Sequence, residues 1–549
     1  MRLHNLFSTL LLAAVALAGT RAHSQAVINE NGATPIFVDS QNGSDLAVAS
    51  AFSSTTNVGT SAAPLQSIQA AINLANTRIQ NNVATKIVVK PGVYRESMDL
   101  EALPSGSSAA LTIEAATAGA AVVSGSNVVS GWQKQSGRPS VWEHSWQYNF
   151  GTCATPSGWP GGIPSVTRRT EMIFVNGHSQ TQVMSSSSLK AGTFYAGSGM
   201  IYVYPSSGTN MSTANVEVAV RSNILTISGR SNVVVRGMTL QHARSCINQS
   251  GSVVNGSTNV LIDSVQAVWN NWGGLAVTSS RNVTVQNSNF SYNGGVGFQG
   301  FELVGATLNS NKSNYNNWRG NLGHFYNWGM GGTKIMLSRN VTVNNHHSYG
   351  NYAQGLWFDT DNKNITVNNV YLSSNYLSGM QLEANEGPLV VKNSHICNSG
   401  MGITVLNNAK LTIQNNTFYN NGGTGQLYDA DLFIAGRSGG HRITDWQTGQ
   451  SYDLFTNNTV VTGNTFENTR TGQFVFGTYL SGGDWSDFAN SLNAGSNRWF
   501  NPAVKNVFKL PSNHQVSFSA WKSAVGTDYS SSWSKPSTSP AGACAIAAQ

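Results

Sequence analysis

Residues 355–388 read GLWFDTDNKNITVNNVYLSSNYLSGMQLEANEGP, and nearly the same phrase occurs twice in this stretch. Each copy begins at a glycine and alternates apolar with polar residues. Each reaches an acid four residues later, Asp359 after Gly355 and Glu383 after Gly379. Short alternating runs that end in asparagine and glycine predict β-strands separated by turns. The phrase therefore predicts one repeated unit built from short strands.

The strand phrase recurs along much of the chain, mostly at intervals of 22 to 27 residues. A unit of this size cannot bury an apolar face alone, whereas stacked copies form a continuous core. Leucine-rich and helical repeats need other patterns, and a propeller blade needs roughly 40 residues. The sequence therefore predicts an all-β, single-stranded parallel β-helix with stacked asparagines at its corners. The copies are SNVVVRG (231–237), TNVLIDS (258–264), RNVTVQN (281–287), RNVTVNN (339–345), KNITVNN (363–369), GPLVVKN (387–393) and AKLTIQN (409–415).

Residues 37–96 suit the amino-terminal end of such a helix. Ile68, Ile72 and Ala75 fall on one face of a short helix, which we expect to cap the open core. The opening FVDSQNGSD…SIQAAI…VVKPGVYRE resembles the right-handed parallel β-helix, pectate-lyase-like superfamily of carbohydrate-active proteins. The resemblance covers nearly the whole chain and implies a right-handed helix. Because lyases, hydrolases, epimerases and phage tailspikes share this scaffold, it does not choose a reaction.

The chain start predicts export. A basic beginning, an apolar run over residues 6–18 and small residues after it are typical of a secretory signal peptide, so we expect a secreted protein, extracellular or periplasmic. No stretch approaches the roughly 20 apolar residues that a spanning helix needs, and no membrane association is predicted.

We expect five parts: a signal peptide (1–24), an N-terminal cap with the first coils (25–130), a β-rich insertion (131–225), a central β-helix carrying the site (226–480), and a C-terminal cap and tail (481–549).

The amino-acid composition limits the kinds of molecule that this protein is expected to bind. Charged residues make up only 10% of the chain, while 14 Trp, 17 Tyr and 21 Phe indicate a folded protein. The net charge of +7 is scattered, so nucleic-acid binding is not predicted, and an acidic polysaccharide stays open as a partner. Cys153, Cys246, Cys397 and Cys544 lack metal-ligand spacing. One or two disulfides are compatible with export, but their pairing stays open.

The repeat brings two acids together. Counted from the strand glycine, alternate positions point outward on one face and include Lys334, Trp357, Asp359, Gln381 and Glu383. Adjacent strands lie about 4.8 Å apart, which predicts stacked Asp359 and Glu383 carboxyl groups about 5 Å apart. A retaining glycosidase needs roughly 5 to 5.5 Å between its two carboxyl groups. Repulsion should also raise one pKa and so provide a proton donor. The structural alternative is that the acids join polar ladders or pair with a neighbouring lysine.

Aromatic residues cluster next to this pair. Trp357 is expected on an outward, exposed position, and exposed aromatic surface often binds a ligand. The inserted stretch NNWRGNLGHFYNWGMGG (316–332) carries Trp318, His324, Tyr326 and Trp328. Together with Lys334 and Gln381 these residues are candidates for binding a polysaccharide or oligosaccharide. The alternative is that the rings bury one another. His346 and His347 are expected to be exposed in the following turn.

The pattern GGTK…GLWFD.DN…G…E also resembles β-helix glycoside hydrolases of the β-xylosidase type. In that family the nucleophilic aspartate and the acid/base glutamate come from adjacent coils. The resemblance implies that Asp359 is the nucleophile and Glu383 the acid/base, with no cofactor. It implies no particular sugar.

Two other functions remain open. In a polysaccharide lyase Lys334 would abstract the proton beside a uronate carboxylate, and Asp359, Asp361 and Glu383 would hold Ca²⁺. Asp361 is otherwise expected to form an Asx turn. In a non-catalytic glycan-binding β-helix the acids would only accept hydrogen bonds from hydroxyl groups. The sequence leaves open the linkage, exo or endo action, and the oligomeric state.

Overall fold

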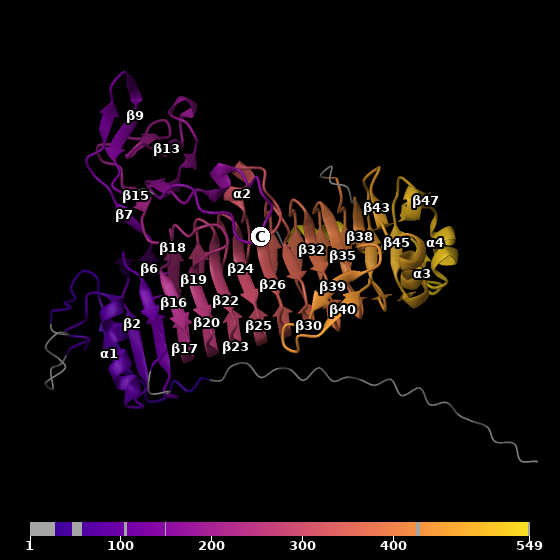
Figure 1. The fold of residues 1–549 in the computed structure, drawn as a ribbon, viewed down its shortest axis with the longest axis horizontal. Helices are drawn as coiled ribbons and strands as arrows, with labels where there is room; N and C mark the ends of the chain where they lie inside the picture. Colours follow the sequence, from indigo (N-terminus) through magenta and orange to yellow (C-terminus); the bar gives the residue numbers. More distant parts are fainter. Residues whose placement is uncertain (1–27, 47–57, 104–106, 149, 424–428, 547–549) are drawn as a thin grey trace, which may run out of the picture.

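The computed structural model describes residues 28–46, 58–103, 107–148, 150–423 and 429–546. Short strands stack in long parallel sheets along one axis, as Figure 1 shows. Most coils of the chain contribute one strand to each of three sheets. The predicted all-β parallel β-helix is therefore confirmed. The predicted signal peptide lies outside the described residues.

Sheet 1 contains the recurring strand phrases, paired in parallel and in register from coil to coil. Its order is β1 (Thr34–Val38), β2 (Thr85–Val89), β5 (Leu111–Ala115), β17 (Ser231–Arg236), β20 (Thr258–Asp263), β23 (Arg281–Gln286), β25 (Val304–Asn309), β27 (Arg339–Asn344), β30 (Lys363–Asn368), β33 (Leu389–Lys392), β36 (Leu411–Gln414), β41 (Val460–Thr462) and β44 (Asn493–Gly495).

Sheet 2 carries the glycine-led strands with Asp359 and Glu383. Its order is β4 (Met98–Leu100), β16 (Leu225–Ser228), β19 (Ser250–Asn255), β22 (Gly273–Thr278), β24 (Val296–Phe301), β26 (Gly331–Met336), β29 (Leu356–Asp359), β32 (Ser378–Glu383), β35 (Met401–Leu406), β38 (Ala430–Ala435), β43 (Phe474–Thr478), β46 (Phe508–Leu510) and the antiparallel β47 (His514–Val516).

Sheet 3 has two parts, joined by single bridges through Asn289 and Lys312. The first part contains β3 (Gly92–Tyr94), β6 (Ala121–Ser124), β18 (Met238–Gln241) and β21 (Gln266–Val268). The second part contains β28 (His347–Tyr349), β31 (Tyr371–Ser373), β34 (His395–Cys397), β37 (Thr417–Tyr419), β42 (Thr465–Glu467), β45 (Arg498–Phe500) and β48 (Ser532–Trp533).

The interior combines an apolar core with asparagine ladders. Alternate strand residues such as Val343, Val367 and Val391 are fully buried and stack along the axis. Buried corner asparagines continue this order: Asn351 Nδ2 donates to Asn375 Oδ1 at 2.8 Å, and Asn351 Oδ1 accepts from Asn316 Nδ2 at 3.0 Å. Because each amide bonds the next coil, buried polar groups remain satisfied. The predicted corner asparagines are thus part of the core.

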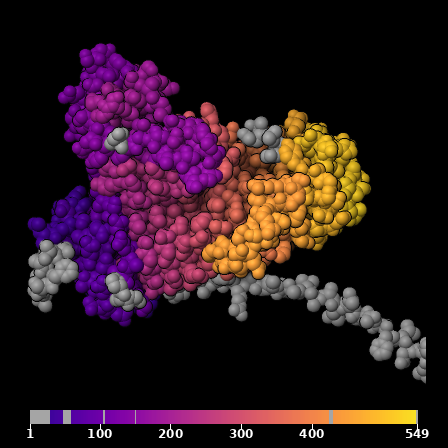
Figure 2. Space-filling view, in the orientation of Figure 1, coloured from indigo at the N-terminus to yellow at the C-terminus, as the bar shows by residue number. Residues whose placement is uncertain are grey.

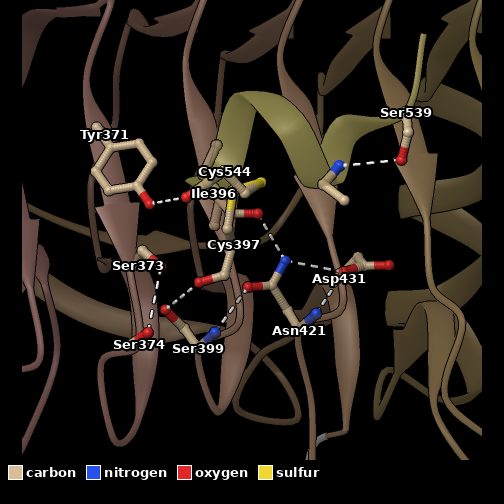
Figure 3. Close-up of a disulfide and its surroundings, with 11 residues drawn as sticks. Tyr371, Ser373, Ser374, Ile396, Cys397, Ser399, Asn421, Asp431, Ser539 and Cys544 are labelled. Atoms are coloured by element: carbon tan, nitrogen blue, oxygen red, sulfur yellow. Dashed lines mark hydrogen bonds between the residues drawn. A yellow bond between two sulfur atoms is a disulfide. The ribbon is translucent and has the colours of Figure 1, made fainter. Parts of the chain in front are cut away.

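Both ends of the helix are covered. Helix α1 (Ile68–Gln80) buries Ile68, Ile72 and Ala75 against the first coils, as predicted. At the other end lie α3 (Gly482–Ser491) and α4 (Phe518–Val525). Figure 3 shows α5 (Pro540–Ile546) fastened to sheet 3 by a disulfide between Cys397 and Cys544. No helix in the described ranges is long and apolar enough to cross a membrane.

Two of the excursions that leave the coils flank sheet 2 (Figure 2). The insertion forms two small sheets, from β7 (Ser126–Val128), β8 (Gln133–Gln135), β9 (Arg138–Ser145), β10 (Ile173–Val175), β11 (His178–Ser179), β12 (Thr181–Gln182), β13 (Thr193–Gly197), β14 (Met200–Tyr204) and β15 (Val216–Ala219). A second disulfide, Cys153–Cys246, ties it to the helix. The other excursion is the hairpin of β39 (His441–Thr444) and β40 (Ser451–Leu454).

Candidate active site

The two repeated acids lie side by side on sheet 2. The parallel pairing of β29 with β32 places Asp359 directly opposite Glu383, as the spacing predicts. The preceding strand β26 places Lys334 opposite Trp357. Both acids, with Lys334, line one cleft of about 900 Å³. Six neighbouring strands of sheet 2, β19, β22, β24, β26, β29 and β32, therefore form the floor of this cleft.

The walls of the cleft come from segments distant in sequence. Trp159 belongs to the insertion, Trp328 to the loop before β26, and Arg437 and His441 to the chain around the start of the hairpin. The centroids of the Trp159 and Trp328 rings lie 6.2 Å apart. The cleft thus has an aromatic wall and a basic wall. An aromatic wall is suited to the apolar face of a ring-shaped ligand.

A lysine compensates the charge of Asp359. Lys334 Nζ lies 2.8 Å from Asp359 Oδ2, donates to the backbone oxygen of Trp328 at 2.6 Å, and lies 3.4 Å from the centroid of the Trp357 ring. Thr360 Oγ1 donates to Asp359 Oδ1 at 2.8 Å. Both carboxylate oxygens therefore have a partner, and the side chain is fixed in orientation. The possibility that a lysine pairs with this acid is confirmed.

Glu383 has a different environment. Burial, followed by the neighbouring charge of Asp359, raises the pKa of Glu383, and the bond from Gln381 together with the charges of Lys334 and Arg437 only partly opposes this. Gln381 Nε2 donates to Glu383 Oε2 at 2.8 Å and is itself oriented by Gln354. A raised pKa keeps a proton on Glu383 at higher pH than on an ordinary glutamate. Glu383 is therefore suited to donate a proton.

Comparison with known proteins settles the handedness of the fold. A family model for a right handed beta helix region matches residues 323–432. The chain is a right-handed parallel β-helix. A solved complex of XylC with xylose has a TM-score of 0.66 to this chain at 15% identity and covers 87% of this chain and 84% of that one. The A-module of the Azotobacter vinelandii mannuronan C-5 epimerase AlgE6 has a TM-score of 0.49 at 17% identity, covering 85% and 95%. No curated protein matches the sequence.

The β-helix places the predicted aromatic residues in four different environments. Trp328 lines the cleft and is 42% exposed. Trp357 is only 5% exposed, so the prediction of an exposed ring was wrong, because the ammonium group of Lys334 lies over it. Trp318 lies in α2 (Trp318–Leu322) and lines a second cleft instead. His324 and Tyr326 bond each other at 3.2 Å and line neither cleft.

Two further expectations need correction or reassignment. His346 was expected to be exposed and is fully buried, where its Nε2 contacts Ser313 Oγ at 2.9 Å. Asp361 is also fully buried; it forms a 2.8 Å ion pair with Arg339 and accepts from the backbone N–H of Trp446 at 2.9 Å. This carboxylate is therefore engaged with the base of the hairpin.

Sequence reasoning missed most of the cleft walls. Trp159, Arg437 and His441 all line the cleft but follow no repeat phrase, whereas Gln299 lies on the floor in β24, opposite Lys334. Cys153 gives one usable signal, because its disulfide with Cys246 brings the neighbourhood of Trp159 next to β19. Arg437 and His441 carry no such signal, since the path of a hairpin outside the coils depends on its tertiary contacts.

Proposed function

We propose that this protein is a secreted retaining glycoside hydrolase that acts on a polysaccharide or oligosaccharide. The observation that carries the proposal is the contrast between two adjacent carboxyl groups, Asp359 beside an ammonium group and Glu383 with a raised pKa. Pairs of acids whose environments differ in this way mark a nucleophile and an acid/base. Their placement on adjacent strands, about 4.8 Å apart, suits the retaining geometry.

The reaction would proceed in two steps. Glu383 donates its proton to the glycosidic oxygen while an Asp359 oxygen attacks the anomeric carbon, so that the sugar–oxygen bond breaks and a glycosyl–enzyme ester forms. Glu383, now ionised, then takes a proton from a water molecule that attacks the same carbon. The ester breaks, Asp359 regains its negative charge, and Glu383 regains its proton. Lys334 holds Asp359 in place during both steps.

The cleft suggests the kind of substrate. Trp159 and Trp328 offer ring faces or edges for the apolar side of a sugar, while Arg437 and His441 offer polar contacts on the opposite wall. The similar fold of XylC, solved with xylose, makes xylose-containing glycans the first substrates to test. Because likeness at 15% identity carries only the fold, the choice of sugar rests on that experiment.

The oxygen donors in the cleft support a calcium-dependent lyase less well than a glycoside hydrolase. The three oxygen donors that it requires are Asp359, Asp361 and Glu383, but the Asp361 carboxylate is bound by Arg339 and Trp446. Within the described residues no group of three or more His, Cys, Asp or Glu side chains could hold a metal ion. These residues do not fit a Ca²⁺ site. Lys334 is also held by three partners rather than free to take a proton.

Product analysis tests the proposal. Purified protein is incubated with xylan, other plant polysaccharides and nitrophenyl glycosides, with calcium or with EDTA, and the products are followed by proton NMR and by absorbance of unsaturated sugars. We expect saturated products that first appear with the anomeric configuration of the substrate. The Glu383→Gln variant should retain activity only on substrates with activated leaving groups, and added azide should restore turnover as a glycosyl azide.

Other outcomes would contradict this assignment. Initial products with inverted configuration would remove the nucleophilic role of Asp359, and unsaturated products would show a lyase. Activity unchanged in Asp359→Asn and Glu383→Gln would move the chemistry elsewhere. Asp453→Asn is the matched control, because Asp453 is a half-exposed hairpin acid that pairs with Arg442 at 3.3 Å and lies outside the cleft.

A further inference from the structure

One corner of the coil holds a column of residues with left-handed backbone angles. Backbone bonds between coils align these residues, for example Tyr292 N to Asn314 O and Tyr315 N to Tyr349 O. The column, with its φ angles, is His242 (65°), Trp269 (55°), Tyr292 (60°), Tyr315 (55°), Gly350 (63°), Ser374 (55°) and Asn398 (52°). Three successive coils place a large aromatic residue in this column, namely Trp269, Tyr292 and Tyr315. The three coils that follow place a glycine, a serine and an asparagine there.

Aromatic residues at this position are strained. Left-handed backbone conformations are unusual for bulky residues, cost on the order of 1 to 3 kcal/mol each, and concentrate at ligand sites. The rings of Trp269 and Tyr292 stack with centroids 4.9 Å apart, and those of Tyr292 and Tyr315 with centroids 5.2 Å apart. Gly350 makes room for this stack, since a Cβ there would lie 2.8 Å from the Tyr315 ring. The stack is therefore accommodated by its neighbouring coil.

The stack forms one wall of a second cleft of about 340 Å³. The cleft is also lined by Trp318 of α2, a helix that lies beside the insertion in Figure 1, and by Phe174 and Gln180 of the insertion. No residue lines both this cleft and the one that contains Asp359. Tyr292 is 38% exposed and Tyr315 40% exposed, so burial beneath the insertion does not account for these rings.

The polar groups of the second cleft favour an uncharged ligand. Glu171 is bound by Arg169 at 2.6 Å, and Arg319 is fully buried with bonds to Gln182, Asn271 and the backbone oxygen of Glu171. Both charged side chains thus already have hydrogen-bond partners within the protein. Gln180 differs, because it is only 8% exposed and its Oε1 has no hydrogen-bond partner. A buried acceptor without a donor is unfavourable unless a ligand or water supplies one.

We propose that the second cleft is a non-catalytic binding site for neutral sugar units of a polysaccharide. The ring edges of Tyr292 and Tyr315, with Trp318, contact the apolar parts of the sugar, and Gln180 Oε1 accepts a hydrogen bond from a sugar hydroxyl. The aromatic wall spans three coils, about 10 Å along the axis, which suits a short stretch of a chain. The choice of a sugar over another neutral ring rests on the proposed function. Binding here would keep a polymer close to the Asp359 cleft and raise its effective concentration.

Affinity electrophoresis through a gel containing soluble xylan tests this site. The Glu383→Gln protein provides a hydrolysis-free background, in which Tyr292→Ser with Tyr315→Ser removes both rings. Serine is chosen because Ser374 occupies the same column with a φ of 55°. We expect the affinity for xylan to fall at least about fivefold, the size of one or two lost aromatic contacts or hydrogen bonds. In the active background, kcat and KM for nitrophenyl glycosides should not change.

Two further variants give an independent test of the site and a control. Gln180→Met removes the free acceptor without touching the strained corner, and we expect a loss of xylan affinity of about fivefold. Tyr529→Ser is the control, because Tyr529 is 66% exposed near the C-terminal end and belongs to neither cleft. It should migrate like the unsubstituted protein. Thermal melting confirms that every variant is folded.

The outcomes separate the two proposals. If the enzyme hydrolyses glycosides but the tyrosine and Gln180 variants bind xylan as before, the second site is overturned and the catalytic proposal stands. If no glycoside is hydrolysed but xylan retards the protein and the tyrosine variant loses this retardation, the second site stands and the catalytic proposal is overturned. If no polysaccharide of the panel is either hydrolysed or bound, both are overturned.

Discussion

Asp359 and Asp361 lie two residues apart and have opposite surroundings. Asp359 ends strand β29 and faces the cleft beside Glu383, with Lys334 as its partner. Thr360 and Asp361 then adopt left-handed φ angles of 51° and 54°, which break the alternation of the strand. The Asp361 side chain consequently turns away and is buried against Arg339. A turn of two residues thus separates an acid that lines the cleft from a structural one.

The hairpin cluster around Asp361 has balanced charges. Its acids are Asp361, Glu386 and Asp445, and its bases are Arg339, Lys363 and Lys410. Burial alone would raise the pKa of Asp445, but the bond from Lys363 and two backbone N–H groups outweigh it and lower the pKa. The Asp359–Glu383 pair shares a single close base, Lys334, and Glu383 keeps its proton more tightly. Balanced charges hold the hairpin in place, whereas the unbalanced pair is available for chemistry.

The largest expected effect follows from Asp359→Asn. If Asp359 is the nucleophile, kcat/KM on glycosides should fall on the order of 10⁴-fold, as when one member of a catalytic triad is lost. The thermal midpoint should change little, because the amide oxygen can still accept from Lys334 and the amide NH2 can donate to the Thr360 hydroxyl. Steady-state kinetics and a melting curve measure the two effects. A large loss of stability with retained activity would reverse the roles that we assign to the two aspartates.

Asp361→Asn should show the opposite behaviour. The substitution removes the carboxylate charge that lies 2.8 Å from Arg339, a side chain that is 7% exposed. Arg339 keeps its 3.3 Å ion pair with Asp445 and its hydrogen bonds to the backbone oxygens of Ser338 and residue 361. Removing one partner of a buried ion pair costs about 3 kcal/mol. We expect that loss in urea unfolding followed by tryptophan fluorescence, with kcat reduced less than in Asp359→Asn. Unchanged stability would mean that the hairpin cluster does not contribute to folding.

Lys334→Met should lower activity by about 10²-fold, the size of one lost preorganised electrostatic contact. Methionine preserves the apolar stem over Trp357, so that the change isolates the ammonium group. The loss should appear mainly in kcat. Lys410→Met, which removes a lysine that is 56% exposed from the hairpin cluster, is the control and should leave kcat unchanged. Equal effects of the two variants would argue against a special role for Lys334.

The smallest expected effect is on the pH dependence of activity, which follows the protonation of Glu383. Because the folded protein raises the pKa of Glu383, the activity that needs its proton should persist above the usual glutamate value of about 4.3 and decline as pH rises through the folded pKa. The raised pKa of Glu383 also stabilises the folded state at pH values below the pKa that this group has in the unfolded chain. That stabilisation is lost as the pH rises through the pKa of Glu383 in the folded protein. Profiles of kcat/KM on activated glycosides should lack this alkaline decline in Glu383→Gln. If Glu383→Gln shows the same alkaline decline, the decline comes from the titration of a group other than Glu383.

The repeat alone was sufficient to predict the coils and the acid pair. Strands such as RNVTVNN and KNITVNN pair in register, with Val343 opposite Val367. The same spacing placed Asp359 opposite Glu383. Both follow from local alternation and from a constant number of residues per coil, since a strand that slips by one residue would bury its polar face. The capping helix was predicted equally well from its apolar face.

The walls of the cleft did not follow from the repeat. Trp357 satisfies the outward pattern but is buried, because Lys334 lies over its ring. Trp318 is close in sequence to Trp328, yet the two line different clefts. His346 lies in a turn whose interior position the pattern did not reveal. Each of these outcomes depends on contacts with a residue outside the local run.

The sequence by itself determined the stacked coils, the asparagine ladders and the adjacency of Asp359 and Glu383, because all three depend on short-range periodicity. The tertiary structure alone decided the pairing of Cys153 with Cys246 and of Cys397 with Cys544. It also decided which segments close the two clefts. The physical reason is that excursions from the coil carry no period, so that their positions depend on side-chain contacts and disulfides between distant parts of the chain.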